Sequence, residues 1–527
     1  MSFNKLLKHR LFVPALFLLV FLAAFLLRSY MFINGDFFYL VDQARDLLLA
    51  KSVAVDQDLT LIGGRTGFGG LFHGVLWIYV IVPFFILAGG NPYFSLVPLF
   101  LLVNLGIIVA GFIVGWKLYN KWIGLLVAFF LTISGELVAS ALITTNAQVL
   151  PIVFLLYLFS IVKFIRGEEK YFVLAIFSIG LGFQFESAFS VLLVPVTVLA
   201  IFFAGKIPKI KYLFLGFLSA LLAVSTFILF DLRHQFLMTS SAFRLFTNTH
   251  KPLPGYEEYS DIIFRVGNRV SALWDSFFSP LYEKNLFLEI LLISIIFSAI
   301  FFLTRKIRTS KMDKFDKEFI FLLFSPVLIF GFYIIYPFPL WSHYLLPIAV
   351  IFSFILTLSI KSIWQTSSLR ILALAFLLLA ALPPLNYFST VYLQNQEYKS
   401  VSDGTYINQK KVAEWVVADS MNKGFSHFVY SPGILTYNMD YLLWYFAKEK
   451  NSKQPENIKS IDTYLILYQP RQGDENAHMF WKENVIRTEA IPVRIKRFDS
   501  GIIVEKIDLS KDKLEVDPNY FQNLIFR

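Results

Sequence analysis

The sequence predicts an α-helical polytopic membrane protein with about 11 to 13 transmembrane helices and a small C-terminal α/β domain. Of its 527 residues, 57% are hydrophobic and only 16% are charged, whereas soluble proteins carry about 25% charged residues. Apolar runs long enough to cross a bilayer, about 20 residues each, recur from Leu11 to about Tyr387 and then stop. We therefore expect a transmembrane domain over residues 1–393 and a folded polar domain over residues 394–527.

Charge and composition exclude several classes of function. The net charge of +10 lies largely in short loops between apolar runs, and the preference for positive loops on the cytoplasmic side explains it without a nucleic-acid partner. The chain has no cysteine, which excludes disulfides, thiolate catalysis and cysteine metal sites. No Walker motif and no dinucleotide-binding glycine pattern occurs, so the chain does not itself drive transport by ATP hydrolysis.

The basic loops predict the topology. The first apolar run, Leu11 to Leu27, follows Lys5, Lys8 and Arg10 and lacks a small-residue cleavage site after it, so we interpret it as a retained first span with a cytoplasmic N-terminus. Counting crossings from there places outside the cytoplasm an external loop over residues 28–70, a large external loop over residues 231–285, and the C-terminal domain. The stretches around residues 140–148, 184–187 and 337–342 are expected on the same side.

Two segments are less regular than the others. The run Leu71 to Ala88 is short and has glycines at both ends, so we expect it to dip into the membrane or lie at its surface; the alternative is a full span. The run Tyr171 to Gly205 is too long for one span and is interrupted by Gln184 and Glu186. It predicts two short spans that meet at an outer turn.

Polar residues near membrane depth are costly and therefore informative. Asp42 and Asp46 share one helical face beside Arg45, and Asp36 directly precedes this amphipathic stretch. A carboxylate at the membrane surface near a cation is a candidate general base, which points to Asp36 and Asp42. The alternative for Asp36 is a helix N-cap.

Further polar groups occur in the other segments expected outside. Arg65 and His73 flank a glycine-rich stretch, where backbone can approach a ligand. Arginine suits phosphate because its fork donates two parallel hydrogen bonds, although basic residues here could equally anchor anionic headgroups. The remaining candidates are Glu136, Asn146, Glu186, Arg233, His234, Arg244 and Lys251.

The C-terminal region reads as a small α/β domain. Apolar spacing predicts a helix over residues 411–422, and β-rich runs predict strands over residues 425–430 and 464–468. A further strand pair is expected between Val493 and Val504.

This pattern resembles the GT-C superfamily of membrane glycosyltransferases, and within it family 39, the protein O-mannosyltransferase and aminoarabinose transferase branch. Asp36, followed by Ala44-Arg45-Asp46-Leu47-Leu48, is similar to the family's acidic motif and the helix after it. The family's usual Asp-Glu pair is not kept, because Phe37 follows Asp36. Asp231-Leu232-Arg233-His234 resembles a motif that opens the family's large external loop.

The resemblance implies sugar transfer on the outer face of a bacterial or archaeal cell membrane. The donor would be a polyprenyl-phosphate-linked sugar, and the acceptor hydroxyl would belong to a lipid, a glycan or a protein. Asp36 would be the general base of an inverting displacement, and basic residues such as Arg65, Arg233, and Arg244 or Lys251 would hold the departing phosphate. The resemblance leaves metal use open, because some relatives use a divalent metal and others do not; if one binds, its ligands would be Asp36 with Glu136 or Glu186.

Two other readings remain at this stage. A secondary transporter or flippase of lipid-linked sugar would have broken helices and internal repeats, and the sequence has a broken segment but no repeat. A non-catalytic protein of the same fold is favoured by the missing second acid after Asp36 and by Glu186, which stands where some relatives carry a histidine.

Overall fold

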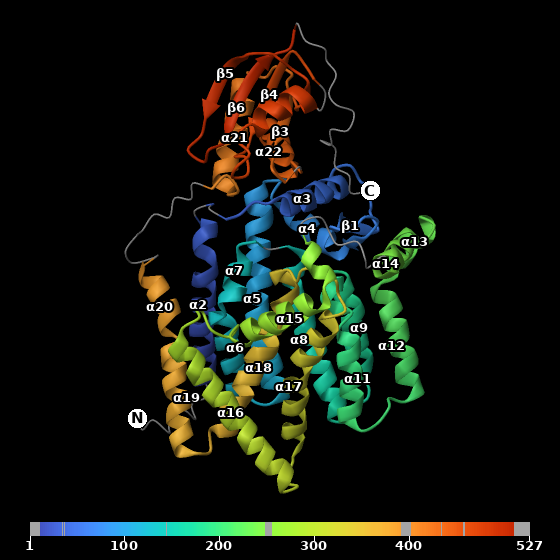
Figure 1. Ribbon diagram of the computed structural model, residues 1–527, viewed down its shortest axis with the longest axis vertical. Helices are drawn as coiled ribbons and strands as arrows, with labels where there is room; N and C mark the ends of the chain where they lie inside the picture. Colours follow the sequence, from blue (N-terminus) through green and yellow to red (C-terminus); the bar gives the residue numbers. More distant parts are fainter. Residues whose placement is uncertain are drawn as a thin grey trace. The chain divides into compact units, whose positions relative to one another are not determined.

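The computed structural model describes residues 11–33, 35, 37–143, 145–247, 256–390, 402–433, 435–456 and 459–510 (Figure 1). The candidates Asp36 and Lys251 lie outside the described residues. The chain divides into two compact units whose segments alternate along the sequence. Unit 1 comprises Met1–Ser29, Thr66–Trp77 and Phe100–Gln396, and unit 2 comprises Tyr30–Arg65, Ile78–Leu99 and Glu397–Arg527.

Long apolar helices dominate the fold. Among the described residues, seven helices are long and apolar enough to cross a membrane, and two bent pairs raise the number to nine if each pair is one span. The seven contain α2 (Phe12–Ile33), α5 (Pro92–Leu118), η1 with α8 (Asn146–Val149, Leu150–Ile165), α10 with α11 (Ser187–Ser190, Leu193–Ala204), α16 (Leu286–Arg308), η3 with α18 (Ser342–Leu345, Leu346–Ile363), and α19 with α20 (Ser367–Ala380, Leu382–Phe388). The bent pairs are α6 with α7 (Lys121–Ile133, Gly135–Ala141), at 59°, and α12 with α13 (Ile210–Ala223, Ser225–Arg233), at 61°.

These helices confirm that the chain is an integral, multi-pass membrane protein. Besides these candidate spans, the described residues contain two shorter apolar helices, α4 (Leu76–Leu87) and α9 (Tyr171–Phe183). With 12 residues, α4 is about 18 Å long, well short of the ~30 Å hydrocarbon core. This length agrees with the expectation that the run Leu71 to Ala88 does not cross by itself. The expected interruption near Gln184 is also present, because α9 ends at Phe183 and α10 begins at Ser187.

The centre of unit 1 is α18. In the candidate span that it forms with η3, 89% of the most apolar stretch is buried inside the protein. It packs against α6, α8, α16 and α17 (Lys314–Tyr333). A helix that is hydrophobic on all sides requires such burial. Its serines do not disturb the packing, because the hydroxyls of Ser353 and Ser359 donate to the carbonyls of Ala349 and Ile355 one turn earlier, at 2.7 and 2.8 Å.

Helix α15 (Ile262–Phe277) of unit 1 is amphipathic: apolar side chains are exposed on it, and an arginine side chain is buried. Ile263 and Val270 are 78% and 61% exposed, whereas Arg269 is 1% exposed. The Arg269 guanidinium donates to the carbonyls of Tyr333, Tyr336 and Phe338 at 3.2, 3.0 and 2.6 Å. Arg269 therefore fixes the turn that follows α17.

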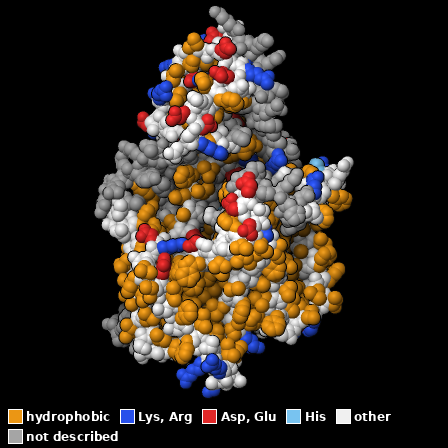
Figure 2. Space-filling model, in the orientation of Figure 1, with side chains coloured by type: hydrophobic (Ala, Val, Ile, Leu, Met, Phe, Trp, Pro, Cys, Tyr) orange, Lys and Arg blue, Asp and Glu red, His pale blue; other side chains and the backbone are white. Residues whose placement is uncertain are grey.

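The surface of the helical part agrees with a membrane location. Hydrophobic side chains cover most of its visible face, and Lys and Arg side chains gather at the end where α16 and α17 are joined (Figures 1 and 2). The basic residues of that junction include Arg305, Arg308 and Lys311, all exposed. Exposed apolar side chains over such an area are expected where lipid, and not water, is the solvent.

Unit 2 contains the predicted α/β domain. Its four-stranded sheet has the order β3-β4-β6-β5, with β3 parallel to β4 and the other neighbours antiparallel. The predicted helix, the two strands and the strand pair are confirmed. The elements are α21 (Tyr406–Asp419), β3 (Ser426–Tyr430), α22 (Tyr437–Glu449), β4 (Asp462–Leu467), α23 (Ala477–Trp481), the π-helical turn η5 (Lys482–Ile486), β5 (Pro492–Arg497) and β6 (Ile503–Asp508).

The segment after the first span belongs to the same unit. The backbone N–H of Tyr39 donates to the carbonyl of Gly404 at 3.0 Å, and the N–H of Tyr406 donates to the carbonyl of Phe37 at 2.9 Å. Helix α3 (Val41–Ala54) follows and packs on α22, and strand β1 (Ile62–Arg65) comes after it. Residues near both ends of the sequence therefore fold together in unit 2.

The crossing of α5 and α6 depends on two glycines and yields a stability prediction. A Cβ on Gly124 would lie 2.4 Å from the carbonyl oxygen of Phe112, and a Cβ on Gly115 would lie 2.8 Å from the Cα of Gly124. Small residues allow such close approach of membrane helices. We expect Gly124→Leu to lower the free energy of unfolding by about 1–3 kcal/mol.

Thermal unfolding in detergent measures the effect of this substitution. The control is Gly267→Leu on α15, where an added Cβ would meet no atom within 4 Å. Equal melting temperatures for the Gly124 variant and the control would contradict the close crossing.

Candidate functional site

The break between α9 and α10 is held by Gln184. This residue is 1% exposed, and its amide donates to the carbonyl of Ala223 at 2.8 Å and to the hydroxyl of Thr226 at 2.9 Å. Ala223 ends α12 and Thr226 lies at the start of α13. One side chain thus links two interruptions of the helical bundle. Backbone groups released by such interruptions need partners of this kind inside a membrane.

Glu186 lies in the same break, directly before the span that begins at Ser187. It is the N-cap of α10, with its side chain accepting from the backbone N–H of Ala188 at 3.1 Å. The residue is only 4% exposed. Burial raises the pKa of the Glu186 carboxyl to about 7, and the hydrogen bond from Ala188 offsets part of this rise. The acid is therefore poised to take up or release a proton near neutral pH.

Three tyrosines lie near Glu186. Tyr333, Tyr336 and Tyr344 all interact electrostatically with its carboxylate, and the side chains of Tyr336 and Tyr344 are hydrogen-bonded to each other. Burial first, and then the negative charge of Glu186, raise the pKa of Tyr336 to about 12. The phenols therefore stay protonated and retain O–H groups as donors beside the acid. Arg269 supports this group, since it binds the backbone of Tyr333 and Tyr336.

His73, on strand β2 (Phe72–Gly74), joins this region through Asn146. The Asn146 amide nitrogen lies 3.2 Å from Nδ1 of His73 and also donates to the carbonyl of Phe185. An amide nitrogen only donates, so Nδ1 of His73 accepts and a neutral ring carries its proton on Nε2. Asn146 thus connects the histidine to the residue directly before Glu186.

Gly74 explains how β2 reaches the break. A Cβ at this position would lie 2.4 Å from the Cα of Gln184 and 2.5 Å from its carbonyl oxygen. Backbone atoms cannot yield as a flexible side chain can, so only glycine allows this approach. The glycine-rich stretch beside His73 therefore has a packing role here.

The turn from α13 to α14 (Leu237–Thr247) carries the basic candidates. Asp231 accepts from the backbone N–H groups of Met238 and Thr239 at 2.6 and 3.0 Å, so it shapes the turn. His234 donates from Nδ1 to the carbonyl of Phe230 at 2.8 Å and stacks on that ring at 4.0 Å. Phe230 in turn packs on Phe72, 5.4 Å between centroids, which brings this turn beside β2.

Two arginines belong to this basic turn. Arg233 is exposed, and so is Arg244, which donates to the hydroxyl of Ser241 at 3.0 Å. Because both arginines are exposed, an anion can reach them. His234 is exposed as well.

In unit 2, α3 holds an acid–arginine cluster. Arg45 donates to Asp46 at 2.8 and 2.9 Å and to Asp42 at 2.7 Å. Burial alone would lower the pKa of Arg45, but the negative charges of Asp46 and Asp42 outweigh it and raise that pKa. The side chain of Asp46 is 3% exposed and that of Asp42 is 59% exposed, so Asp42 is the accessible acid.

Gly64 makes room for this arginine, because a Cβ there would lie 2.2 Å from Nε of Arg45. Arg65, the next residue, is exposed and offers its carbonyl to Arg45 at 3.4 Å. The N-cap position of α3 is Leu40. Asp36 lies outside the described residues.

The structure brings some predicted residues together and leaves others apart. His73, Asn146 and Glu186 form one connected group in unit 1, whereas Glu136, exposed at the start of α7, has Lys284 and Asp275 as its charged neighbours. Within the described ranges, no three His, Asp or Glu side chains gather as metal ligands. Sequence reasoning missed Tyr336 and Tyr344 as neighbours of Glu186, because an aromatic belt accounts for such residues equally well.

Comparison with known proteins identifies the fold. No protein-family model and no curated protein matches the sequence. The crystal structure of ArnT from Cupriavidus metallidurans bound to undecaprenyl phosphate is similar over 94% of this chain and 98% of that one, with a TM-score of 0.57 and 11% identity. The apo structure of the same protein matches over 93% and 97%, with a TM-score of 0.55 and 12% identity. The chain therefore has the GT-C fold, and the predicted resemblance is confirmed at the level of the fold.

The buried acid predicts a pH-dependent stability. The pKa of Glu186 in the folded protein, about 7, lies above the ordinary glutamate value of 4.5, so the folded state binds more protons between these two values. Stability then falls as pH rises from about 4.5 to 7, by up to about 3 kcal/mol. We expect Glu186→Gln, which keeps the acceptor for Ala188, to remove this part of the pH dependence.

Melting temperatures in detergent between pH 5 and 8 measure this effect, with Glu258→Gln as the exposed control. A Glu186→Gln variant with the same pH slope as the wild type would show that the carboxyl is not buried as described.

The cluster on α3 gives a second prediction. The substitution Arg45→Met removes the guanidinium that neutralises the buried Asp46 carboxylate. We expect it to lower the free energy of unfolding by about 3–5 kcal/mol. Arg65→Met, on an exposed side chain, should change stability by less than about 0.5 kcal/mol. The double variant Arg45→Met with Asp46→Leu should recover much of the loss. Chemical denaturation of the three variants measures these differences, and equal losses for Arg45→Met and Arg65→Met would refute a buried pair.

Proposed function

We propose that this protein is a membrane glycosyltransferase that moves a sugar from a polyprenyl-phosphate donor to an acceptor hydroxyl. The observation that carries the proposal is the similarity to ArnT over nearly the whole of both chains. That protein was crystallised with undecaprenyl phosphate, and the carrier proposed here belongs to the same lipid class. A fold alone does not determine chemistry, so the residues must supply the rest of the argument.

The proposed reaction is a single displacement with inversion. The acceptor oxygen forms a bond to the anomeric carbon while the bond from that carbon to the phosphate oxygen breaks. The acceptor proton passes to a carboxylate, and polyprenyl phosphate departs. We assign the carboxylate to Asp36 from its place directly after the first span. Asp42, accessible and paired with Arg45, is a second acid for orienting the acceptor.

Departure of the phosphate needs positive charge. Arg233 and Arg244 are exposed at the α13–α14 turn, with His234 between them in sequence, and Lys251 follows in the same loop. A guanidinium fork donates two parallel bonds to phosphate oxygens. Arg65 is a further exposed cation in the first external loop. These residues are the proposed phosphate ligands.

The polar group around Glu186 has the hydrogen-bonding side chains that a sugar-binding site needs. It offers a carboxyl group, the phenols of Tyr336 and Tyr344, and the His73–Asn146 pair. Together these groups can donate and accept hydrogen bonds, as recognition of sugar hydroxyls requires. We propose that this group binds the donor sugar or the acceptor. No step requires a metal, although Asp36 with Glu136 or Glu186 would be the ligands to test.

We propose that the site lies on the outer side of the membrane. Lys and Arg side chains gather where α16 and α17 are joined (Figures 1 and 2), and positive loops favour the cytoplasm. Glu289 lies in the first turn of α16 and Tyr333 is the last residue of α17, so both lie at the helix ends away from this junction. The N-terminus would then be cytoplasmic and the C-terminal domain extracytoplasmic, in a bacterial or archaeal cell membrane.

A second candidate function is movement of lipid-linked sugar across the bilayer. The two bent helix pairs, at 59° and 61°, are of the kind that transporters use at their substrate sites. A non-catalytic protein of the GT-C fold is the third reading. Transfer and transbilayer movement are measured separately, so the three are distinguishable.

Asp36→Asn tests the proposed enzyme. Purified protein is reconstituted in vesicles with radiolabelled polyprenyl-phosphate sugars and membrane acceptors. We expect transfer by the wild type and a loss of about 10²–10⁴-fold in the variant, since that is the usual contribution of a general base. The matched control is Asp56→Asn, an acid of the same external loop that is 49% exposed and paired with Lys51.

Equal transfer by wild type and Asp36→Asn would remove Asp36 as the base. No transfer in either, with fluorescent lipid-linked sugar moving across the vesicle membrane, would favour the flippase. Donor binding with neither activity would favour the non-catalytic reading.

A further inference from the structure

A basic surface lies where α16 joins α17, and no step of the proposed transfer uses it. Figure 2 shows Lys and Arg side chains gathered at this end of the helical part, where Figure 1 shows the two helices joined. Its five exposed basic residues, here called the junction cations, are Arg305, Arg308, Lys311, Lys314 and Lys317. Within the described ranges, the ion pairs of the junction are made by Lys306, and none of the five junction cations takes part in one.

Basic side chains in two other loops are paired with acids of the protein itself. Arg166 donates to the two carboxylate oxygens of Glu318 at 2.6 and 2.9 Å, and Lys206 donates to Glu169 at 2.8 Å. The preference of basic loops for the cytoplasm concerns their charge and does not require the side chains to be unpaired. The junction cations differ from these residues, because no acid of the described chain neutralises them. A negatively charged binding partner would do so.

The turn that carries these cations is fixed by hydrogen bonds. Lys306 donates to both carboxylate oxygens of Asp316, at 2.8 and 3.0 Å, and thereby joins the end of α16 to the start of α17. Asp313 and Asp316 form a capping box, in which each side chain accepts from the backbone N–H of the other residue at 2.9 Å. The N–H of Lys311 donates to the carbonyl of Lys306 at 3.0 Å. A surface held in this way loses little conformational entropy when it binds a ligand.

The helix dipoles account for only part of this arrangement. Arg305 and Arg308 lie in the last turn of α16, where the dipole favours positive charge. Lys314 and Lys317 are the first and fourth residues of α17, at the end where the dipole favours negative charge. These two lysines therefore do not stabilise the helix that carries them. An anion bound beside them would offset this unfavourable placement.

The exposed face of α16 changes from apolar to basic side chains along the helix. Residues 297, 301, 305 and 308 recur at the helical spacing of three or four, so they lie on one face. Phe297 and Phe301 are each 65% exposed, as expected of side chains that face lipid. Arg305 follows Phe301 by about 6 Å along the helix axis. The basic end of this face therefore lies directly beside its lipid-facing part.

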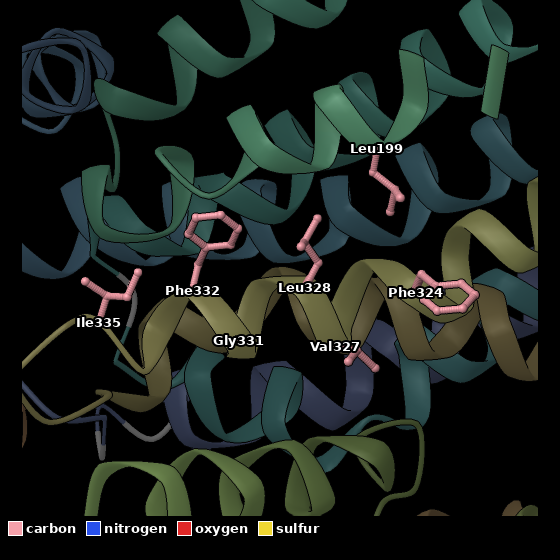
Figure 3. A pocket seen from close by; sticks show the side chains of 7 residues that line it. All are labelled: Leu199, Phe324, Val327, Leu328, Gly331, Phe332 and Ile335. Carbon is pink, nitrogen blue, oxygen red and sulfur yellow. The ribbon is translucent and has the colours of Figure 1, made fainter. Parts of the chain in front are cut away.

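The exposed face of α17 shows the same order. Lys317 and Phe324 are about two turns apart and share a face of the helix. Phe324 and Val327 are 57% and 56% exposed, and both belong to the apolar lining drawn in Figure 3. On both helices the cations begin where the lipid-facing side chains end, which is the depth of the lipid headgroups.

We propose that the junction cations bind the anionic headgroups of glycerophospholipids in the adjacent leaflet. A lipid matches both parts of these helix faces, because its phosphate meets the cations while its acyl chains lie against the apolar side chains. A soluble anion would use the cations alone. Basic clusters next to a membrane helix attract anionic lipids, and each Lys or Arg strengthens the attraction about fivefold. The inference is independent of sugar transfer and of which leaflet the junction faces.

Fluorescence quenching tests this proposal on the full-length protein in nanodiscs. Because the chain has no cysteine, Phe301→Cys provides a single site for a bimane fluorophore beside the junction. The bilayer is phosphatidylcholine with a minor share of phosphatidylglycerol, and one lipid or the other carries bromine atoms that quench bimane on contact. We expect a relative binding constant about fivefold in favour of phosphatidylglycerol at this position. Raising the salt concentration about tenfold should remove most of the preference, because salt screens exposed charges.

A second reporter provides the comparison within the same helix. Phe287→Cys places the fluorophore near the other end of α16, where Phe287 is 58% exposed. We expect no preference for phosphatidylglycerol there, because the junction cations lie at the opposite end of α16. Equal preference at positions 287 and 301 would overturn the proposal, since it would reflect the protein surface in general.

A triple variant identifies the residues. Replacing Lys311, Lys314 and Lys317 by Gln in the Phe301→Cys protein should lower the preference to about twofold or less. This variant keeps Arg305, Lys306 and Arg308, so its loop stays basic. The matched control replaces the same number of exposed lysines in the C-terminal domain by Gln, at Lys411, Lys423 and Lys453. It should bind phosphatidylglycerol as the protein with native lysines does.

Three further outcomes would overturn the proposal. The first is equal quenching by the two lipids at position 301, and the second is an unchanged preference in the triple variant. The third is a preference that inorganic phosphate abolishes at constant ionic strength, which would make the junction a site for soluble anions. If the triple variant does not fold, the two reporters and the salt dependence still decide, because they leave all junction cations in place.

Discussion

The contact between Gly74 and Gln184 determines the geometry of the polar region in unit 1. Backbone lies against backbone there, because a Cβ on Gly74 would come within 2.4 Å of the Cα of Gln184. On its other side, Gln184 holds the break between α12 and α13 through Ala223 and Thr226. The placement of His73 on β2 and of Glu186 at the α10 N-cap follows from this arrangement. A backbone interrupted inside a membrane must be satisfied by neighbouring protein, and Gln184 meets that requirement.

Much of the fold was predictable from the sequence because its causes are local. Apolar runs of sufficient length predict the spans, and Gln184 with Glu186 in such a run predicts the break that separates α9 from α10. The three-residue spacing of Asp42 and Arg45 predicts their ion pair. Unpredictable features depend on residues far apart in sequence. The pairing of Phe37 with Tyr406, the space that Gly64 leaves for Arg45, and the tyrosines near Glu186 have no periodicity or motif.

The candidate residues fall into groups with different electrostatic character. On α3 the charges largely neutralise one another, because Arg45 is hydrogen-bonded to the carboxylates of Asp42 and Asp46. On the α13–α14 turn, Arg233 and Arg244 remain exposed. Glu186 is a single acid among phenols. The proposed transfer from a lipid phosphate needs cations for the departing phosphate and a carboxylate for the acceptor proton, and the candidate groups lie on separate elements of the chain. The fold is shared with ArnT although only 11% of the aligned residues are identical.

The absence of cysteine has a consequence for how this molecule can be studied. Because none of its 527 residues is a cysteine, the native chain has no thiol that maleimides or thiosulfonate reagents could label. A single cysteine placed in the α16–α17 junction or in the α13–α14 turn becomes the sole reactive group. An impermeant reagent added to sealed vesicles would then report on which side of the bilayer that segment lies. The same silent background accepts paired spin labels, so distances between α3 and the helices of unit 1 become measurable without first removing any native residue.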